Sequence, residues 1–375
     1  MDSRAQFEDI FEKIMNKTAN NAKLIGADFP KTAHGSKYEI TDEIHDWTNG
    51  FWPGLMWLLY LAKNDDAAKD IAVSCENRLD EAFIKHFSQL GHDVGFVYTL
   101  TSCIHYEKTQ NPDSLKRIYA AATALAARFN LAGRYIRSWN DLPDKNTSRW
   151  TIADNMMNLP LLYRASKLTK DPRFYHVATA HAETMQKYLL RNDGSANHII
   201  CFHPETGENE PNEETAEYTQ GRDTTSCWTR GNAWVICGFT YCYSYTKKTE
   251  FLEAAKKSAR FFLSHLPKER IPPIDFCAPL DGTDTSAGAI AASGMIELAK
   301  YVQNDEKEEF LNGAEEILLA LDAQFADYSL ATQPILSGGA TRYHGEGMRN
   351  VSLIYGDFYY AEAIFKLLGG ESLFC

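Results

Sequence analysis

Amphipathic and wholly apolar stretches alternate along this chain of 375 residues. An amphipathic stretch repeats apolar side chains at helical spacing and keeps one polar face, as Phe7, Ile10 and Ile14 illustrate. A stretch that is apolar nearly all round needs burial on every side. We expect amphipathic helices at residues 5–26, 67–87, 114–130, 172–190, 250–267 and 306–326, and buried helices at residues 47–60, 92–107, 151–168, 228–246, 284–302 and 352–368.

The pattern gives six pairs, each made of one amphipathic and one apolar helix. Such pairs can pack as two concentric rings, with the apolar helices in the inner ring and the amphipathic helices in the outer ring. A solenoid uses the same pairing but leaves an open groove. Six pairs are the number that closes an (α/α)6 barrel, so we predict an all-α barrel that forms a single domain over residues 1–375. The inner helices begin with polar or aromatic residues suited to a pocket, namely Trp47, Asn49, Asp93, Asp154, Trp228, Arg230, Asp284, Thr285 and the segment before Ser352.

The longest predicted loop, residues 191–227, runs into the same end of the barrel. It contains a predicted strand within residues 197–202, then a turn signal, then an acidic stretch at residues 208–217 that we interpret as a solvated rim. Loops of this length inside a compact domain are commonly functional or mobile.

The composition allows a large core and disfavours two classes of partner. The chain is 44% hydrophobic, its formal net charge is −12, and no block of lysine or arginine is long enough to follow a phosphate backbone. We therefore expect neither nucleic acid nor an anionic membrane as a partner. Net charge does not exclude a small anionic ligand, because a few cationic side chains focused in a pocket suffice to bind one.

The eight cysteines form no CxxC pair and have no metal-like spacing with histidine, which is typical of small buried hydrophobes in a reducing compartment. The N-terminus lacks the features of a signal peptide, and no apolar run reaches the length of a membrane span. His176 and His181 are five residues apart and do not share a helix face as zinc ligands would. These patterns predict a cytoplasmic protein with no metal and no cofactor, and they leave the oligomeric state open.

Two aspartates stand near the starts of buried helices, Asp93 in the run HDVGF and Asp154 in the run TIADNMMNLPL. Taken singly, an aspartate at a helix start is usually a cap that stabilises free N–H groups by about 1 kcal/mol. Two aspartates in equivalent positions favour another interpretation, in which neighbouring helix starts bring both carboxyl groups to one pocket. Such a pair suits acid and base chemistry on a sugar.

Tryptophans, an arginine and a histidine are expected near the same end of the barrel. Trp47, Trp52, Trp139, Trp228 and Trp234 are candidates for the walls of a sugar pocket, although large aromatic side chains also fill barrel cores. Arg230 lies in an otherwise apolar helix start and needs an anionic partner, either a structural aspartate or a substrate carboxylate. His198 is either a surface loop histidine or a pocket group near its titration range.

Five runs taken together resemble the unsaturated glucuronyl hydrolases, which form glycoside hydrolase family 88. They are HDxGF at 92–96, IRSWN at 136–140, ADxMMNLP at 153–160, WxRGxAW at 228–234 and YGDFY at 355–359. The similarity extends from about Trp47 to the C-terminus. It implies an (α/α)6 barrel that removes the 4,5-unsaturated uronic acid left at the non-reducing end when a lyase cuts a glycosaminoglycan. The implied partner is an unsaturated uronyl disaccharide or oligosaccharide.

The resemblance also implies roles for single residues. Asp154 matches the general acid and base, and Asp93 matches the partner that holds ring hydroxyls. Positions that match sugar contacts or aromatic walls are Trp47, Trp139, His198, Gln220, Arg230 and Trp234. In the implied reaction Asp154 protonates C4 of the double bond and then deprotonates the water that adds at C5. This double duty needs a raised pKa, and we expect a partly dry pocket and the Asp93 carboxylate to raise the pKa of Asp154.

Two positions depart from the family pattern. Members that prefer sulfated chondroitin carry a Ser-x-x-Ser-x-Lys run, whereas residues 342–347 read RYHGEG here. The sequence thus gives no support for a 6-sulfate preference, and Arg342 and His344 become the candidates for substrate contact in this stretch. Asn232 stands where glutamine is usual, a change that we do not interpret.

Three other functions fit part of the pattern. An unsaturated rhamnogalacturonyl hydrolase shares the barrel and the mechanism but prefers a rhamnose neighbour. A non-catalytic barrel that binds oligosaccharides would use the tryptophans without needing Asp154. A helical scaffold for protein partners would expose apolar grooves in place of a sugar pocket.

Overall fold

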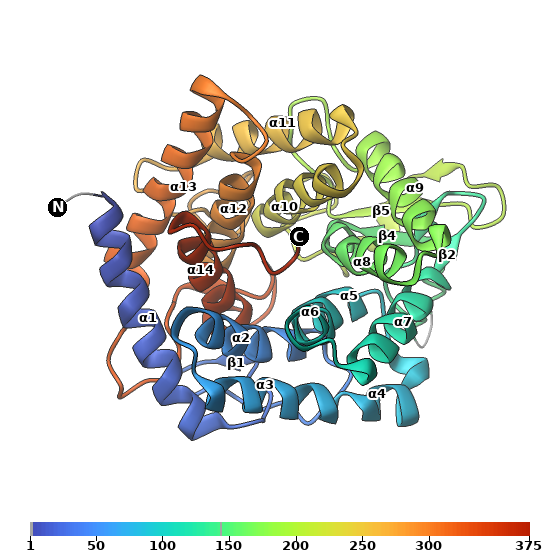
Figure 1. The fold of residues 1–375 in the computed structure, drawn as a ribbon. Coiled ribbons are helices and arrows are strands. Elements are labelled where there is room, and N and C mark those ends of the chain that lie inside the picture. The colour runs from blue at the N-terminus through green and yellow to red at the C-terminus, as the bar shows by residue number, and fades with distance from the viewer. Residues whose placement is uncertain (1–2, 143–144) are drawn as a thin grey trace.

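The helices form two concentric rings in the computed structural model, which describes residues 3–142 and 145–375 (Figure 1). The inner ring contains α2 (Phe51–Lys63), α5 (Val94–Tyr98), α6 (Ile104–Thr109), α8 (Leu159–Thr169), α10 (Thr229–Thr246), α12 (Thr285–Leu298) and α14 (Ile354–Leu367). The outer ring contains α1 (Ser3–Ile25), α3 (Asp66–Arg78), α4 (Asp80–Lys85), α7 (Pro112–Ala126), α9 (Pro172–Tyr188), α11 (Thr249–His265) and α13 (Asn304–Phe325). The predicted (α/α)6 barrel is therefore confirmed.

The inner ring is closed. Neighbouring segments of the inner ring pack against one another, with η3 (Thr99–Cys103) joining α2 to the α5–α6 segment, and α14 near the end of the chain packs against α2 near its beginning. Phe51 of α2 meets Phe358 and Tyr359 of α14 at this junction, with ring centroids 5.6 and 5.9 Å apart. Closure distinguishes the molecule from a solenoid with an open groove. None of the described helices has the length and apolarity that a bilayer crossing requires.

One inner helix starts later than its apolar pattern predicted. Residues 151–158 form the end of strand β4 (Trp150–Ile152) and the 3-10 helix η4 (Ala153–Asn158) before α8 begins. The aromatic and β-branched residues of β4 favour a strand, and they pair antiparallel with β5 (Ile199–Phe202), which is the strand predicted in the long loop. A second irregularity is the π-helical turn η3 (Thr99–Cys103), which joins α5 to α6.

Short strands shape the loops at the end of the barrel where the inner helices begin. Strand β4 leads into η4, and β8 leads directly into α14. The sheets have the orders β1-β8-β7, β2-β3 and β4-β5-β6. The other strands are β1 (Thr32–Ala33), β2 (Phe129–Asn130), β3 (Tyr135–Ile136), β6 (Asn209–Glu210), β7 (Gly339–Ala340) and β8 (Arg349–Leu353).

The opposite end of the barrel is filled by the last residues of the chain. The C-terminus lies near the centre of the ring in Figure 1. Phe374 is buried and stacks on Tyr241 of α10 and Tyr359 of α14, with ring centroids 5.5 and 6.0 Å apart. Cavities between the inner helices therefore open at the end where those helices start.

Candidate active site

Neither of the two aspartates caps its helix. Asp93 immediately precedes α5, but its side chain makes no capping hydrogen bond. Asp154 lies inside η4, whose start also lacks a side-chain cap. Asp284 shows the contrast, because it caps α12 by accepting from the backbone N–H of Ser286. The capping interpretation thus fails for Asp93 and Asp154, and their carboxyl groups are available for other contacts.

The segments that carry the two aspartates touch each other. Asn158 Nδ2 donates to Oδ1 of Asp93 over 3.4 Å and to the backbone carbonyl of Asp154 over 3.1 Å. Helix starts that are 61 positions apart in sequence therefore meet in space, as their equivalent places in the repeat predicted.

Asp154 is buried, with 8% of the residue exposed. Burial raises the pKa of its carboxyl group to about 6, and the positive charge of Arg230 opposes that rise. Its Oδ2 atom accepts no hydrogen bond from any described residue. A desolvated carboxyl group with a pKa close to neutral and one uncommitted oxygen has the properties of a general acid and base.

The two carboxyl groups do not influence each other in the expected direction. We expected the charge of Asp93 to help raise the pKa of Asp154, but burial is what raises that pKa. Burial and then the charge of Asp154 raise the pKa of Asp93 well above its usual range, and Asp46 adds to the rise. In a coupled pair, the carboxyl group with the lower pKa ionises first, and its negative charge then raises the pKa of the other group. Asp93 is therefore the member of the pair that holds its proton more tightly.

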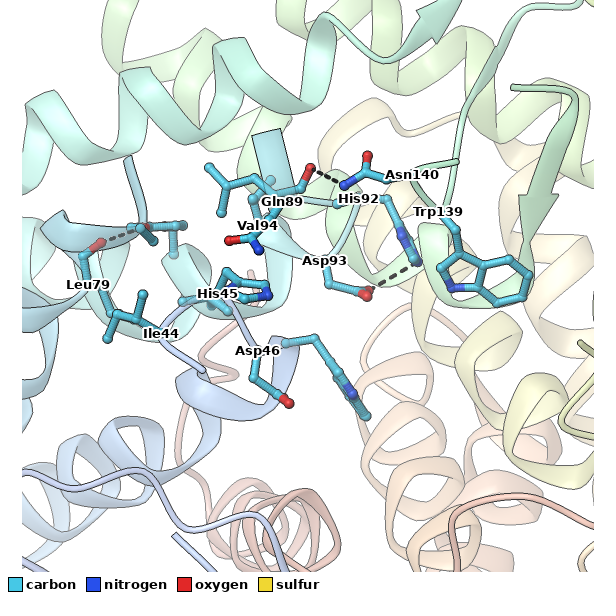
Figure 2. A pocket seen from close by; sticks show the side chains of 16 residues that line it. Ile44, His45, Asp46, Leu79, Gln89, His92, Asp93, Val94, Trp139 and Asn140 are labelled. Carbon is cyan, nitrogen blue, oxygen red and sulfur yellow. Dashed lines mark hydrogen bonds and ion pairs between the residues drawn. The ribbon is translucent and has the colours of Figure 1, made fainter. Parts of the chain in front are cut away.

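His92 lies beside Asp93, and its ring is neutral. Its Nδ1 atom is 2.9 Å from the backbone carbonyl of Ser138, and because a carbonyl only accepts, Nδ1 carries the hydrogen. Burial, helped by the positive charge of Arg128, lowers the pKa of His92 to about 3. The bare Nε2 atom is 3.1 Å from Oδ1 of Asp93 (Figure 2). A neutral ring avoids an isolated positive charge at this buried position.

His198 is buried and does not lie on the surface, with 5% of the residue exposed. The backbone N–H of Gln220 donates to its Nδ1 atom over 3.0 Å, so Nδ1 is an acceptor and Nε2 carries the hydrogen. Nε2 is 3.8 Å from Oδ2 of Asp154. Burial and the charges of Arg230 and Arg342 lower the pKa of His198 to about 3. The ring is therefore neutral, and its N–H group lies near Asp154 without bonding to it.

Arg230 pairs with a structural aspartate, which was one of the two anionic partners that the sequence allowed. Its Nη1 atom donates to Oδ2 of Asp284 over 2.6 Å and to the backbone carbonyl of Ala340. Its Nη2 atom donates to Oε1 of Gln220 over 3.0 Å and to the backbone carbonyl of Thr341 over 2.7 Å. Four protein acceptors thus occupy its terminal N–H groups. The guanidinium anchors the loop before Arg342 and orients the Gln220 amide, whose Nε2 donor remains for a ligand.

Two cavities share Trp47 as a wall. One has a volume of about 220 Å³ and is lined by Asp93, His92 and Trp139. Figure 2 shows Asp93 in this cavity, with His92 and Trp139 on one side and His45 and Asp46 on the other. The other cavity has a volume of about 580 Å³ and is lined by residues that include Gln220, Arg230, Arg342 and Tyr355. Trp47 and Trp139 are half-buried, as expected of rings that face a ligand.

Three predicted contact residues, Trp234, His344 and His198, are absent from the walls of both cavities, as is Asp154. Trp234 is completely buried against Phe96 and Tyr359, so it forms part of the floor beneath the aspartates and no part of the cavity walls. His344 is exposed, and its Nε2 atom bonds to the backbone carbonyl of Arg222 over 2.7 Å, which ties two loops together. Neither residue lines the two cavities.

Two site residues had a signal in the sequence that we did not use, because His92 and Asn158 belong to the two runs that contain the aspartates. Asp284 was expected only as a polar residue at the start of an inner helix, and not as the partner of Arg230. Their importance comes from contacts with residues distant in sequence, which no local pattern reveals. Among the described residues, no group of three or more histidine, cysteine or acidic side chains is arranged to hold a metal ion.

The chain is similar to known hydrolases along nearly its whole length. It is 33% identical to the unsaturated glucuronyl hydrolase of Bacillus sp. (strain GL1), over 94% of each chain. It is 31% identical to the unsaturated chondroitin disaccharide hydrolase of Streptococcus pyogenes serotype M1, over 96% of this chain and 91% of that one. The crystal structure of the unsaturated glucuronyl hydrolase from Bacillus sp. GL1 superposes with a TM-score of 0.90 at 31% identity, covering 96% of each chain. Because residues 22–272 also match Glycosyl Hydrolase Family 88, the chain belongs to that family.

Proposed function

We propose that the protein is an unsaturated glucuronyl hydrolase, which removes the 4,5-unsaturated uronic acid from the non-reducing end of glycosaminoglycan oligosaccharides that a lyase has cut. The observation that carries the proposal is Asp154, a buried carboxyl group with a pKa of about 6 and an oxygen without a partner in the described chain. Relatives of similar length are named for this activity, which supports the same reaction.

The first chemical step is protonation of the substrate double bond. C4 and C5 form a vinyl ether with the ring oxygen, so a proton added at C4 leaves a cation at C5 that the ring oxygen stabilises. Asp154 in its acid form supplies this proton and becomes a carboxylate. No glycosidic bond is attacked, so the carboxylate spacing that separates retaining from inverting enzymes does not apply.

The second step is addition of water at C5. The Asp154 carboxylate accepts a proton from water while the water oxygen bonds to C5, which regenerates the acid. The product is a hemiketal that opens to a 5-keto group and frees a hemiacetal at C1. Collapse of that hemiacetal releases the neighbouring sugar and a 4-deoxy-5-keto uronate, so the net reaction consumes one water.

The surrounding residues bind and orient the substrate in this proposal. The raised pKa of Asp93 favours its protonated form, which both donates and accepts hydrogen bonds and so suits sugar hydroxyls better than a carboxylate that only accepts. His198 and the amide of Gln220 present N–H donors, and Arg230 contributes a positive charge that attracts the substrate carboxylate. Trp47 offers a ring face to the sugar.

The larger cavity is the proposed site for the neighbouring sugar. Arg342 lines it, is exposed, and makes no ion pair or side-chain hydrogen bond within the described chain. It therefore has donors to offer to an anionic substituent on that sugar. His344 is tied to the Arg222 carbonyl and is not part of this proposal.

The activity is tested with purified protein and unsaturated disaccharides from chondroitin, hyaluronan and heparin, by following the ultraviolet absorbance of the conjugated double bond. We expect the absorbance to fall with the native protein and to persist with Asp154→Asn. Persistence on all three disaccharides with the folded native protein would overturn the proposal. Consumption of an unsaturated rhamnogalacturonan disaccharide in that case would identify the rhamnogalacturonyl hydrolase instead.

A reducing compartment such as the cytoplasm is our proposal for the place of action. All eight cysteines are unpaired and six of them are buried. Burial raises the pKa of buried thiols such as Cys103 to about 12, which keeps them as unreactive thiols. Cell fractionation with an antibody to the protein tests this location.

A further inference from the structure

One buried amide joins the two segments that carry the aspartates. Asn158 closes η4, is completely buried, and reaches across to the start of α5. Its Oδ1 atom accepts from the backbone N–H of Phe96 over 2.8 Å. Because that N–H only donates, the oxygen of the amide must face it, and the Nδ2 atom must face the aspartates.

Both hydrogens of Nδ2 are used on the catalytic side. One is directed at the backbone carbonyl of Asp154, 3.1 Å away, and the other at Oδ1 of Asp93, 3.4 Å away. A buried amide with all its hydrogen-bonding groups engaged has one orientation, so it transmits that orientation to its partners. The three bonds hold the start of α5, the backbone at Asp154 and the Asp93 carboxyl group in one arrangement.

Gly95 permits the close approach of these segments. A Cβ atom at residue 95 would lie 2.4 Å from Cα of Asn158 and 2.5 Å from its Oδ1 atom. Those distances are far below van der Waals contact, so a side chain at this position would push α5 away from η4. The run that contains Asp93 and the run that contains Asp154 therefore carry complementary residues, a glycine in one and an asparagine in the other.

Other groups around Asp93 leave the Asn158 donor with a specific role. Asp154 and Asp46 face the carboxyl group with negative charge, Arg128 faces it with positive charge, and the neutral His92 offers a bare nitrogen. The hydrogen bond from Asn158 lowers the pKa of Asp93 against burial and the two carboxylates. It also engages Oδ1, the same oxygen that lies 3.1 Å from Nε2 of His92.

We propose that Asn158 is a positioning residue, which fixes the Asp93 carboxyl group relative to Asp154 through this three-bond bridge. The inference rests on the proposed function, because the spacing matters for catalysis only if Asp154 transfers the proton. Loss of the bridge leaves the substrate able to bind, but its double bond no longer lies in reach of Asp154 in a productive geometry. The rate constant of the chemical step then falls more than the apparent affinity.

Asn155 supplies a matched control from the same 3-10 helix. It is equally buried, and its Nδ2 atom donates to the backbone carbonyl of Ile136 over 2.7 Å and to Oγ1 of Thr151 over 2.9 Å. Asn155→Ala therefore removes as many donors as Asn158→Ala without breaking a bond to Asp93 or to the Asp154 carbonyl. The two variants are expected to lose similar thermal stability.

The experiment measures kcat, KM and Tm for native protein, Asn158→Ala and Asn155→Ala on the disaccharide that the native protein consumes fastest. We expect kcat of Asn158→Ala to be at least about tenfold below that of Asn155→Ala, with KM values within about threefold. Asn158→Asp is the second test if the alanine variant does not fold, because it keeps the side-chain volume and the acceptor for Phe96. It should show the same loss of kcat, with the falling limb of its pH profile moved to higher pH by the added carboxyl group.

Equal kcat values for the variants of Asn158 and Asn155, at equal stability, would overturn the positioning role while the native activity stands. An equal rise of KM and no fall of kcat would also overturn it. An inactive native protein overturns both the positioning role and the proposed function, so the two failures are distinguishable.

Discussion

The Nε2 atom of His198 lies 3.8 Å from Oδ2 of Asp154, and it carries a hydrogen. A histidine this close to a proposed acid would compete for the proton if its ring accepted one. Burial and nearby arginines lower the pKa of His198 to about 3, and Gln220 already occupies its Nδ1 atom. In the proposed mechanism the proton transfers therefore fall to Asp154, toward which His198 can act only as a hydrogen-bond donor.

The first prediction concerns the pH dependence of activity. Asp154 must be protonated to start the reaction, and its pKa is about 6. Raising the pH above this value ionises the acid, so kcat/KM should fall about tenfold per pH unit above that pKa. A kcat/KM profile between pH 5 and 8 on an unsaturated disaccharide checks this, and a profile that is flat across pH 6 to 8 would contradict it.

The second prediction concerns the stability cost of the same carboxyl group. Its pKa rises from an ordinary value of 3.8 to about 6 on folding, so the folded state binds the proton more tightly and stability falls as pH rises between these values. The ionised group then costs about 3 kcal/mol at pH 7. Asp154→Asn cannot ionise, so it should be more stable than the native protein at pH 7.5 and gain less at pH 5. Thermal unfolding at both pH values measures this, and a variant that is less stable at pH 7.5 would count against the buried charge.

The third prediction separates the two nitrogens of His198. Asparagine places an acceptor near the position of Nδ1, and glutamine places a donor near the position of Nε2. His198→Asn keeps the partner for the Gln220 N–H but removes the donor toward Asp154, so kcat should fall about 10- to 100-fold. His198→Gln keeps that donor and should retain more activity. Steady-state kinetics of both variants test the assignment, and the reverse order would refute the tautomer derived from the Gln220 bond.

The sequence predicted the barrel because its inner and outer helices differ in how apolar residues are distributed around the helix axis, and the sequence pattern shows that distribution directly. Apolar residues on every side, as in α2 and α12, require an inner position, and amphipathic residues such as those of α1 require an outer one. The meeting of Asp93 and Asp154 followed from their equal places in the repeat. The late start of α8 was missed, although the β-favouring residues of β4 carried a signal for it.

Contacts between distant segments account for what the sequence did not predict. Arg230 is bound by Asp284 and by the Ala340 and Thr341 carbonyls, 54 to 111 residues away, and nothing in its local run announces those partners. Which aspartate holds its proton more tightly also depends on the packed pocket, because burial and Asp46 act together on Asp93. The site residues were thus easier to name than their protonation states.

The fourth prediction concerns the neighbouring sugar. Arg342 lines the larger cavity and has no partner among the described residues, so it has donors for an anionic substituent. Arg342→Gln should raise KM by about two- to fivefold for a sulfated chondroitin disaccharide, since an exposed ion pair contributes little. KM for the unsulfated disaccharide should change less, and kcat should change for neither. An equal change of KM for both disaccharides would mean that Arg342 does not bind the sulfate substituent.

The last prediction uses the buried pair of Arg230 and Asp284, whose substitution should move the falling limb of the kcat/KM pH profile in opposite directions. The Arg230 charge lowers the pKa of Asp154, so Arg230→Met should raise that pKa and shift the falling limb of kcat/KM to higher pH. Asp284→Asn keeps a good cap for α12 but removes the charge that compensates Arg230, so the limb should shift to lower pH. Breaking a buried pair costs about 3–5 kcal/mol, so both variants should also lose stability in thermal unfolding. Both variants lose stability, but their electrostatic effects on Asp154 have opposite signs. Shifts of the falling limb in the same direction for both variants would therefore exclude Arg230 as the charge that sets the pKa of Asp154.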